Sequence, residues 1–249
     1  MKEERYFYSP NPTKGILTAE ESNHATKVLR LKEGDDIQII DGKGNLYHCI
    51  ITLVKKQECH YEIRETNHFE SPWNKYLDIV VAPTKNMDRT EWFAEKATEI
   101  GVDQIDFVNC KFSERKVIKT ERIEKIVVSA IKQSHKFYKP TINEIKSFKD
   151  IVTTPFDGTR CIAHCYEDSE LLINGSYKPF LLDAIAPSDS AIQVLIGPEG
   201  DFSADEVKLA LKNGFIPISL GESRLRTETA ALVAVHLMQL SARKQGPIK

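Results

Sequence analysis

No run of apolar residues in this 249-residue chain approaches the ~18–20 residues of a membrane-spanning helix. The first ten residues, MKEERYFYSP, lack an apolar core, so we expect no signal peptide. The five cysteines are an odd number without a paired framework, which favours a reducing compartment. With 41% apolar and 28% charged residues, the composition is typical of a soluble globular protein, and we expect it to be cytoplasmic.

Several common catalytic signatures are also missing. No Gly-x-Gly-x-x-Gly follows an apolar strand, no P-loop Lys-Ser/Thr is present, and there is no Ser-centred hydrolase elbow. Cys161, His164 and Cys165 are spaced like metal ligands, but in a strand the two cysteines share a face that His164 does not. We therefore interpret the cysteines as packing residues and expect no metal.

Charge is unevenly distributed along the chain. The net charge of −2 argues against a molecule that is basic all over. From Lys111 to Lys149, however, eleven Lys and Arg residues stand against four Asp and Glu. Such a basic stripe is typical either of a surface that binds a polyanion or of a solvated helix face.

The first 70 residues are rich in strand-forming sequence. Residues 36–40, 46–54 and 59–65 favour strands, Asp41–Asn45 favours a hairpin turn, and 22–31 contain a helical patch. We interpret residues 1–70 as a small β-barrel-like module. The polar stretch Thr66–Lys75, which contains Pro72, is interpreted as a linker between domains.

From Tyr76 onward, short strands alternate with helices. The predicted strands are 77–82, 104–108, 160–165, 191–196 and 215–220, and the predicted helices are 88–101, 120–137, 203–214 and 227–243. Capping boxes at Asp88/Glu91 and Ser203/Glu206 begin two of the helices. This alternation predicts an α/β fold with a mostly parallel sheet and helices on both faces. The last helix is apolar on two sides, and either a partner subunit or another part of the chain would cover the second side.

Two glycine-containing turns follow predicted strands near the C-terminus. Gly197-Pro198-Glu199-Gly200 follows residues 191–196, and Leu220-Gly221 begins the segment that leads into the last helix. Glycine lets the backbone approach a ligand closely, and ligands in open α/β sheets bind at the carboxyl ends of strands. Because Glu199 would repel a phosphate, these turns favour a neutral or cationic ligand with a nucleoside part.

These segments resemble the RsmE family of the SPOUT superfamily of knotted methyltransferases, which methylates N3 of a uridine in 16S ribosomal RNA. The resemblance rests on Gly197–Ser203 with Glu206, and on Leu220-Gly221 followed by Leu225–Ala230. It extends over nearly the whole chain through further matches at Arg5-Tyr6-Phe7, His24–Gly34, Lys85 with Asp88-Arg89, Lys96–Gly101, and Gln133-Ser134 with Pro140. The chain departs from the family pattern at Asp201, in place of a second glycine, at Arg224, in place of isoleucine, and at His135-Lys136.

The resemblance implies a SPOUT-type, trefoil-knotted, parallel-sheet methyltransferase domain at 76–249, preceded by a PUA-like β-barrel RNA-binding domain at 1–70. It also implies S-adenosyl-L-methionine as cofactor and a homodimer with the active site near the interface. The implied partner is 16S rRNA in the small ribosomal subunit or its assembly intermediate.

Three sets of residues are assigned on this basis. Arg226, and after it Arg5, are the catalytic candidates, because a guanidinium near O2 or O4 would favour the uridine anion. The cofactor set is Leu195, Ile196, Gly197, Pro198, Glu199, Gly200, Leu220, Gly221, Leu225, Arg226, Thr227, Thr229 and Ala230. The RNA-binding set is Arg30, Lys32, Arg115, Lys116, Lys132 and Lys136.

Other functions fit parts of the same pattern. One is a SPOUT methyltransferase that acts on tRNA or on another rRNA atom, and another is a non-catalytic RNA-binding factor for ribosome assembly. A nucleotide-dependent enzyme of flavodoxin-like type is a third, against which the missing phosphate motif argues.

Overall fold

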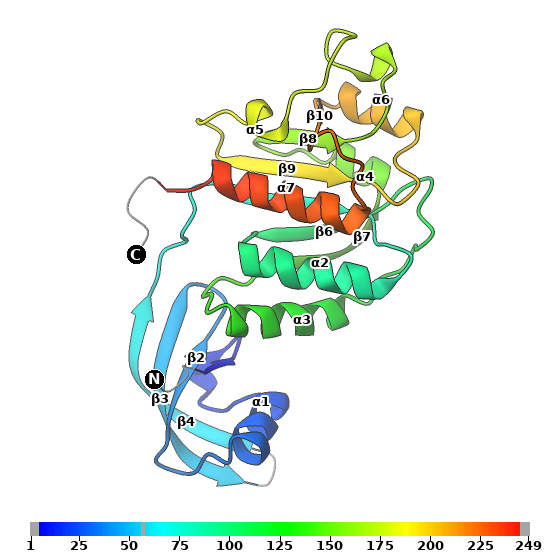
Figure 1. The fold of residues 1–249 in the computed structure, drawn as a ribbon. Coiled ribbons are helices and arrows are strands. Elements are labelled where there is room, and N and C mark those ends of the chain that lie inside the picture. The colour runs from blue at the N-terminus through cyan, green and yellow to red at the C-terminus, as the bar shows by residue number, and fades with distance from the viewer. Residues whose placement is uncertain (1–4, 56–57, 245–249) are drawn as a thin grey trace. The chain divides into compact units, whose positions relative to one another are not determined.

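A computed structural model of the chain describes residues 5–55 and 58–244 (Figure 1). The chain divides into two compact units. The first holds the residues up to Ser71 together with Val128–Lys139, and the second holds Pro72–Val127 and the residues from Pro140 onward. Each unit contains its own sheet and its own apolar clusters.

The first unit is built on a four-stranded sheet in the order β1-β2-β3-β4. Its elements are β1 (Tyr6–Tyr8), the 3-10 turn η1 (Pro12–Lys14), α1 (Ala19–Asn23), the π-helical turn η2 (His24–Val28), β2 (Asp36–Ile40), β3 (Asn45–Lys55) and β4 (Glu58–His68). β1 is parallel to β2, and the other two pairs are antiparallel. The predicted hairpin turn is confirmed, because Asp41 Oδ1 accepts the N–H groups of Lys43 and Asn45 at 2.7 and 3.2 Å.

The chain before α1 runs along the outer edge of β4. Tyr61 N–H donates to Gly15 O at 2.9 Å, and Leu17 N–H donates to Cys59 O at 3.0 Å. The core of this unit lies between the sheet and the helical turns, which contribute Ala25. The predicted helical patch at 22–31 begins earlier, at Ala19, and ends at Val28.

The second unit contains a six-stranded sheet in the order β10-β8-β9-β5-β6-β7, and every neighbouring pair is parallel. The strands are β5 (Tyr76–Val81), β6 (Gln104–Asn109), β7 (Thr141–Ser147), β8 (Thr159–Ala163), β9 (Ala191–Ile196) and β10 (Ile216–Ile218). The predicted parallel α/β sheet is therefore confirmed. β7 was not predicted, because this edge strand is mainly polar and lacks an apolar run.

Helices cover both faces of the six-stranded sheet (Figure 1). They are α2 (Met87–Ile100), α3 (Thr120–Gln133), α4 (Phe148–Thr153), α5 (Leu181–Ala184), α6 (Ala204–Lys212) and α7 (Thr227–Ser241), with a 3-10 turn η3 (Ser169–Leu171). α2 and α7 pack on one face around Phe93 and Ala234, and α4 and α6 pack on the other around Phe148 and Phe202. Among the helices of the described residues, none has both the length and the hydropathy needed to cross a membrane.

Side-chain caps fix where two of these helices begin. Ser203 and Glu206 form the predicted capping box at the start of α6. The box predicted at Asp88 is wrong: α2 begins at Met87, and its cap is Asn86, whose side chain accepts the Asp88 N–H at 3.1 Å. Glu91, which was expected to close that box, instead forms an ion pair with Arg122 at 2.6 Å.

Two further boundaries differ from the prediction. α3 ends at Gln133 rather than near Phe137, and His135 adopts a left-handed φ of 54° just beyond it. The expected linker at 66–75 begins inside β4, which pairs with β3 as far as His68. Its other end is anchored to the second unit, because Trp73 Nε1 donates to Asp103 Oδ2 at 3.0 Å.

A row of polar side chains crosses the sheet of the second unit near the amino ends of its strands. Gln193 of β9 accepts from Arg160 Nε at 3.0 Å and donates to Asp78 Oδ2 at 2.6 Å. Burial, and after it the charge of Asp106, raises the pKa of Asp78 to about 7. Asp78 is therefore a buried carboxyl group that titrates near neutral pH.

Candidate active site

A cavity of about 810 Å³ opens at the carboxyl ends of β8, β9 and β10. β8 lies between β10 and β9, and all three run parallel, so the loops that follow them meet at one edge of the sheet. Ligands bind at this edge in open α/β sheets, and the volume is typical of a small-molecule pocket. Ile196, Ile218 and Leu225 contribute apolar side chains to its lining.

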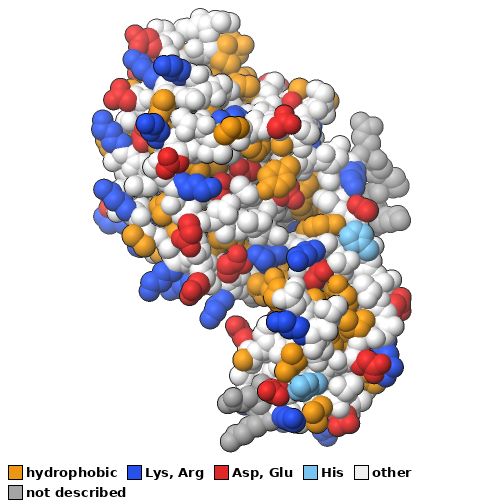
Figure 2. Space-filling model, turned by 180° about the vertical axis from the view of Figure 1, so that it is seen from behind, with side chains coloured by type: hydrophobic (Ala, Val, Ile, Leu, Met, Phe, Trp, Pro, Cys, Tyr) orange, Lys and Arg blue, Asp and Glu red, His pale blue; other side chains and the backbone are white. Residues whose placement is uncertain are grey.

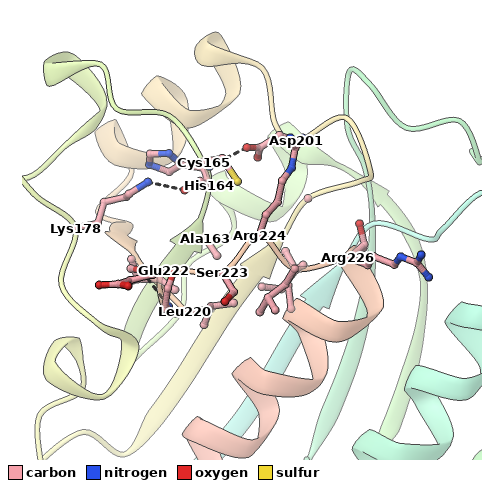
Figure 3. A pocket seen from close by; sticks show the side chains of 18 of the residues that line it. Ala163, His164, Cys165, Lys178, Asp201, Leu220, Glu222, Ser223, Arg224 and Arg226 are labelled. Atoms are coloured by element: carbon pink, nitrogen blue, oxygen red, sulfur yellow. Dashed lines mark hydrogen bonds between the residues drawn. The ribbon is translucent and has the colours of Figure 1, made fainter.

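The loop after β9 is held in shape by Asp201. A turn is closed by the Asp201 N–H, which donates to Pro198 O at 2.9 Å, and Asp201 itself has a left-handed φ of 63°. Its carboxylate accepts the N–H of Phe202 at 2.7 Å and that of Cys165, beyond β8, at 2.8 Å. Asp201 thus adopts a conformation that favours glycine, and its side chain joins the loop after β9 to the segment after β8 (Figure 3).

The glycines of this loop allow close packing. A Cβ on Gly197 would lie 3.1 Å from the Phe202 ring, and a Cβ on Gly200 would lie 3.1 Å from Cβ of Phe112. Both distances are tighter than ordinary van der Waals contacts. The loop therefore turns sharply between the buried Phe202 ring and Phe112, which follows β6.

The loop after β10 leads into the N-terminus of α7. Gly221 has a φ of 121°, which favours glycine, and its N–H donates to Ser219 Oγ at 3.1 Å. Arg226 is the N-cap residue of α7 and makes no side-chain cap, so the first turn of the helix keeps N–H groups that no cap satisfies. In Figure 3 the Arg224 side chain extends toward Asp201, whereas Arg226 points away from Lys178 and His164.

The third wall of the cavity comes from the segment after β8. Lys178 Nζ donates to the backbone carbonyls of His164 at 2.7 Å and Tyr166 at 3.0 Å, which fixes the path of this segment (Figure 3). Burial, and after it the charge of Lys178, lowers the pKa of His164 to about 4, so the imidazole is neutral at pH 7. No local sequence pattern predicts this wall, since its contacts join backbone carbonyls to a lysine more than ten residues away.

The two cysteines of this segment have different environments. Cys161 packs in the core as predicted, and burial raises the pKa of its thiol to about 12. The prediction is wrong for Cys165, which is exposed and lines the cavity because β8 ends at Ala163. Within residues 5–55 and 58–244, no group of three His, Cys, Asp or Glu side chains is placed to hold a metal ion.

The charged groups that line the cavity are nearly balanced. Four carboxylates, those of Glu167, Glu199, Asp201 and Glu222, are set against the cations of Lys178, Arg224 and Arg226. The Glu199 carboxylate accepts the Lys85 N–H at 2.9 Å, which fixes it at the rim. Such a lining suits a ligand with separate positive and negative groups better than a polyphosphate.

Most of the predicted cofactor set meets at this cavity. The predicted residues among its lining are Ile196, Gly197, Pro198, Glu199, Leu220, Gly221, Leu225, Arg226, Thr227 and Ala230. The other three, Leu195, Gly200 and Thr229, do not line it: Leu195 lies in the core on the α6 face, and Gly200 packs against Phe112. The lining residues that were not in that set come mainly from the segment after β8 and from Glu222–Arg224.

The predicted catalytic and RNA-binding residues are divided between the two units. Arg226, Arg115 and Lys116 belong to the second unit. The others belong to the first: Arg5, Arg30, Lys32, Lys132 and Lys136. Arg5 lines a separate cavity of about 710 Å³ in that unit.

These basic residues differ in how far they are available to a ligand. Arg30, Lys32 and Lys116 are exposed. Arg115 donates to the backbone carbonyls of Thr84 and Lys85, and Lys132 forms an ion pair with the buried Glu21 at 2.6 Å. On the face shown in Figure 2, basic and acidic side chains are interspersed. An anion-binding surface on this face would therefore be limited to a small area.

Two family models match this chain. Residues 71–239 match a model described as an RNA methyltransferase domain, and residues 17–64 match one described as an RNA methyltransferase PUA domain. Ribosomal RNA small subunit methyltransferase E of Bacillus subtilis is 30% identical over 230 residues, which are 88% of this chain and 87% of that protein. The chain belongs to this family of RNA methyltransferases. The predicted resemblance is therefore confirmed.

Solved structures of the family share the fold over almost the whole chain. A probable rRNA methyltransferase from Porphyromonas gingivalis has a TM-score of 0.85 and 36% identity, with 96% of this chain and 98% of that chain covered. Ribosomal RNA small subunit methyltransferase E of Neisseria gonorrhoeae, solved bound to S-adenosyl methionine, has a TM-score of 0.81 and 26% identity over the same shares.

Proposed function

We propose that this protein is an S-adenosyl-L-methionine-dependent methyltransferase that methylates N3 of a uridine in 16S rRNA of the small ribosomal subunit. The observation that carries the proposal is the three-loop cavity at the carboxyl ends of β8, β9 and β10 in a chain of this methyltransferase family. The basic and exposed residues of both units support an RNA substrate.

The cavity fits the cofactor in size and charge. S-adenosyl-L-methionine combines a sulfonium, an ammonium and a carboxylate with an adenosine, and the lining combines four carboxylates, three cations and apolar side chains. Backbone groups of Ile196–Glu199 and Leu220–Leu225 would hold the adenine and ribose, with the side chains of Ile196, Ile218 and Leu225 around them. When bound, this group supplies an electrophilic methyl carbon.

Arg226 is proposed to favour the reactive form of the substrate. Uridine N3 must lose its proton before it attacks the methyl carbon, and the negative charge then spreads to O2 and O4. Arg226 stands at the N-terminus of α7, so its guanidinium and the positive end of the helix dipole would act on the same anion. Among the described residues, none forms a hydrogen bond or an ion pair with the Arg226 side chain, so its N–H groups can donate to a ligand. Arg5 remains the second candidate.

The finer architecture is also part of the proposal. We propose that residues 76–249 form a trefoil-knotted methyltransferase domain and residues 1–70 a PUA-like RNA-binding domain. The position of β9 between the earlier strands β5 and β8 supports a knotted path. The exposure of Trp92 on α2 and Leu240 on α7 supports a homodimer. The enzyme would act in the cytoplasm, on the small subunit or its assembly intermediate.

Analysis of the methylated product tests the proposal. Small ribosomal subunits from a strain that lacks the methylation are incubated with the protein and S-adenosyl-L-methionine, and the RNA is digested to nucleosides for mass spectrometry. We expect 3-methyluridine in 16S rRNA. Another methylated nucleoside, or methylation of tRNA alone, would contradict the assigned target. Absence of any product despite tight binding to the subunit would indicate a non-catalytic assembly factor.

The role of Arg226 has its own test. We expect Arg226→Ala to lower kcat by roughly 10²–10³-fold, the loss typical of one electrostatic donor to a developing oxyanion. The affinity for S-adenosylhomocysteine should change much less, and Arg226→Lys should recover part of kcat. If cofactor affinity falls as steeply as kcat in both variants, Arg226 holds the cofactor instead.

A further inference from the structure

An apolar side chain is presented to solvent by a tight turn next to the cofactor cavity. Phe112 follows β6 and is 45% exposed, while Cys110 and Ser113 on either side of it are buried. Ser113 N–H donates to Cys110 O at 3.1 Å, and Cys110 N–H donates to Ser113 Oγ at 2.9 Å. The turn is therefore closed by reciprocal hydrogen bonds, and it holds the phenyl ring outward at its tip.

The Phe112 turn is fixed against the loop after β9. Lys111 N–H donates to Glu206 Oε1 at 2.8 Å, which ties the turn to the first turn of α6. Gly200 lets Phe112 come close, since a Cβ at position 200 would lie 3.1 Å from Cβ of Phe112. The residues on either side of Gly200, Glu199 and Asp201, line the 810 Å³ cavity. Phe112 thus packs behind the loop that forms this wall of the cavity.

Lysines lie on both sides of this ring along the chain. Lys111 Nζ lies 5.8 Å from the centroid of the ring, and Lys116 and Lys119 are exposed on the same segment. The single acid of segment 110–119 is Glu114, whose charge is balanced by Lys85 at 2.7 Å. An exposed aromatic ring with exposed lysines on the same segment is an arrangement with which proteins bind single-stranded nucleic acid: the ring stacks on a base and the cations contact phosphates.

We propose that Phe112 is a stacking platform for an unpaired nucleotide next to the target uridine, with Lys111 and Lys116 contacting its phosphates. The inference rests on the proposed function and adds to it an RNA subsite at the cavity rim. The target base must leave its stack to reach the cavity, and a ring fixed beside the rim would replace the lost stacking of its neighbour.

Substitution of the ring tests the platform, with RNA affinity as the measurement. We expect Phe112→Leu to weaken binding of 16S rRNA by about five- to 150-fold, the range of one base–aromatic stacking contact, and Phe112→Tyr to stay within about threefold of the original protein. The affinity for S-adenosylhomocysteine should not change in either variant. Tyr76→Leu is the matched control, because Tyr76 is similarly exposed (42%) but lies at the amino end of β5.

A fluorescence signal provides a direct second measurement. Phe112→Trp should place a tryptophan reporter on the turn, and its emission is obtained as the difference from the original protein, which has Trp73 and Trp92. Stacking on a base should quench its emission when 16S rRNA is added.

Each negative result leads to a different conclusion. Phe112→Leu binding RNA as tightly as the original protein, or unquenched emission of Phe112→Trp with bound RNA, would overturn the platform. A changed oligomeric state of Phe112→Leu with unaltered RNA affinity would also overturn it, and would assign the ring to a protein interface. If the original protein transfers no methyl group but Phe112→Leu still loses RNA affinity, the proposed function fails and the platform stands.

Discussion

Replacement of Asp201 should change cofactor affinity in an order that follows from its backbone conformation. The residue has a φ of 63°, and its carboxylate accepts N–H groups from Cys165 and Phe202 at 2.8 and 2.7 Å. Hydrogen bonds to charged groups are worth ~1.5–3 kcal/mol each when buried, and these half-exposed ones fall at or below the lower end. A side chain with a Cβ but no local hydrogen bond adds ~1–2 kcal/mol of strain at this φ.

The three replacements at this position separate these two contributions. Asp201→Asn keeps one acceptor oxygen and tolerates the left-handed conformation, so we expect a loss of ~1 kcal/mol, or about fivefold in affinity. Asp201→Gly loses both hydrogen bonds, but glycine adopts this φ without strain. The expected loss is ~2 kcal/mol, or about 30-fold in affinity. Asp201→Ala loses the hydrogen bonds and adds the strain, which gives ~3 kcal/mol, or about 150-fold.

Calorimetric titration with S-adenosylhomocysteine measures the three affinities. Thermal unfolding of each variant serves as a control for loss of the fold. Because the loop lies at the edge of the sheet, we expect all three variants to remain folded. The decisive comparison is between glycine and alanine, which both lack the carboxylate. Equal affinities for Asp201→Gly and Asp201→Ala would refute the role of backbone conformation. Unaltered affinity in both variants would refute the role of the hydrogen bonds that the Asp201 carboxylate accepts.

Two further predictions concern stability. The folded-state pKa of Asp78, about 7, exceeds its ordinary value near 4, so its contribution to stability is fully present below pH 4 and is lost as the pH rises through 7. Asp78→Asn should remove this pH dependence and gain up to ~4 kcal/mol at pH 8 in denaturant unfolding, whereas parallel pH profiles for the two proteins would contradict the assignment. Lys75 Nζ donates to three backbone carbonyls, those of Ala186, Pro187 and Asp189, at 2.6–3.1 Å. Lys75→Met should therefore cost ~3 kcal/mol in the same experiment, and a loss below ~1 kcal/mol would show that water replaces the ammonium.

The sequence could predict the two glycine turns because their residues serve the backbone directly. Gly197 packs closely against Phe202, five residues further on, and Gly221 adopts a φ of 121°, so both requirements act within a few residues of chain. The strand–helix alternation likewise predicted the parallel sheet, since each element carries its own periodicity. The capping box at Ser203 and Glu206 could be predicted for the same reason.

What the sequence could not predict depends on contacts between distant segments. Lys178 shapes the third wall of the cavity by bonding the carbonyls of His164 and Tyr166, and no local pattern signals such a contact. In the sequence, Asp201 stands out only as a departure from the family pattern, although its side chain joins two loops. Asn86 and Asp88 are both good caps; the structure has Asn86 as the cap, and Glu91 pairs with the distant Arg122.

A crystal structure of the protein with S-adenosylhomocysteine tests the central claim most directly. We expect the adenosine in the cavity formed by the loops after β8, β9 and β10, with the backbone of residues 196–199 and 220–225 within hydrogen-bonding distance. We also expect Arg226 to border the space into which the methyl group would point. A ligand bound elsewhere, such as in the 710 Å³ cavity of the first unit, would contradict this assignment of the site.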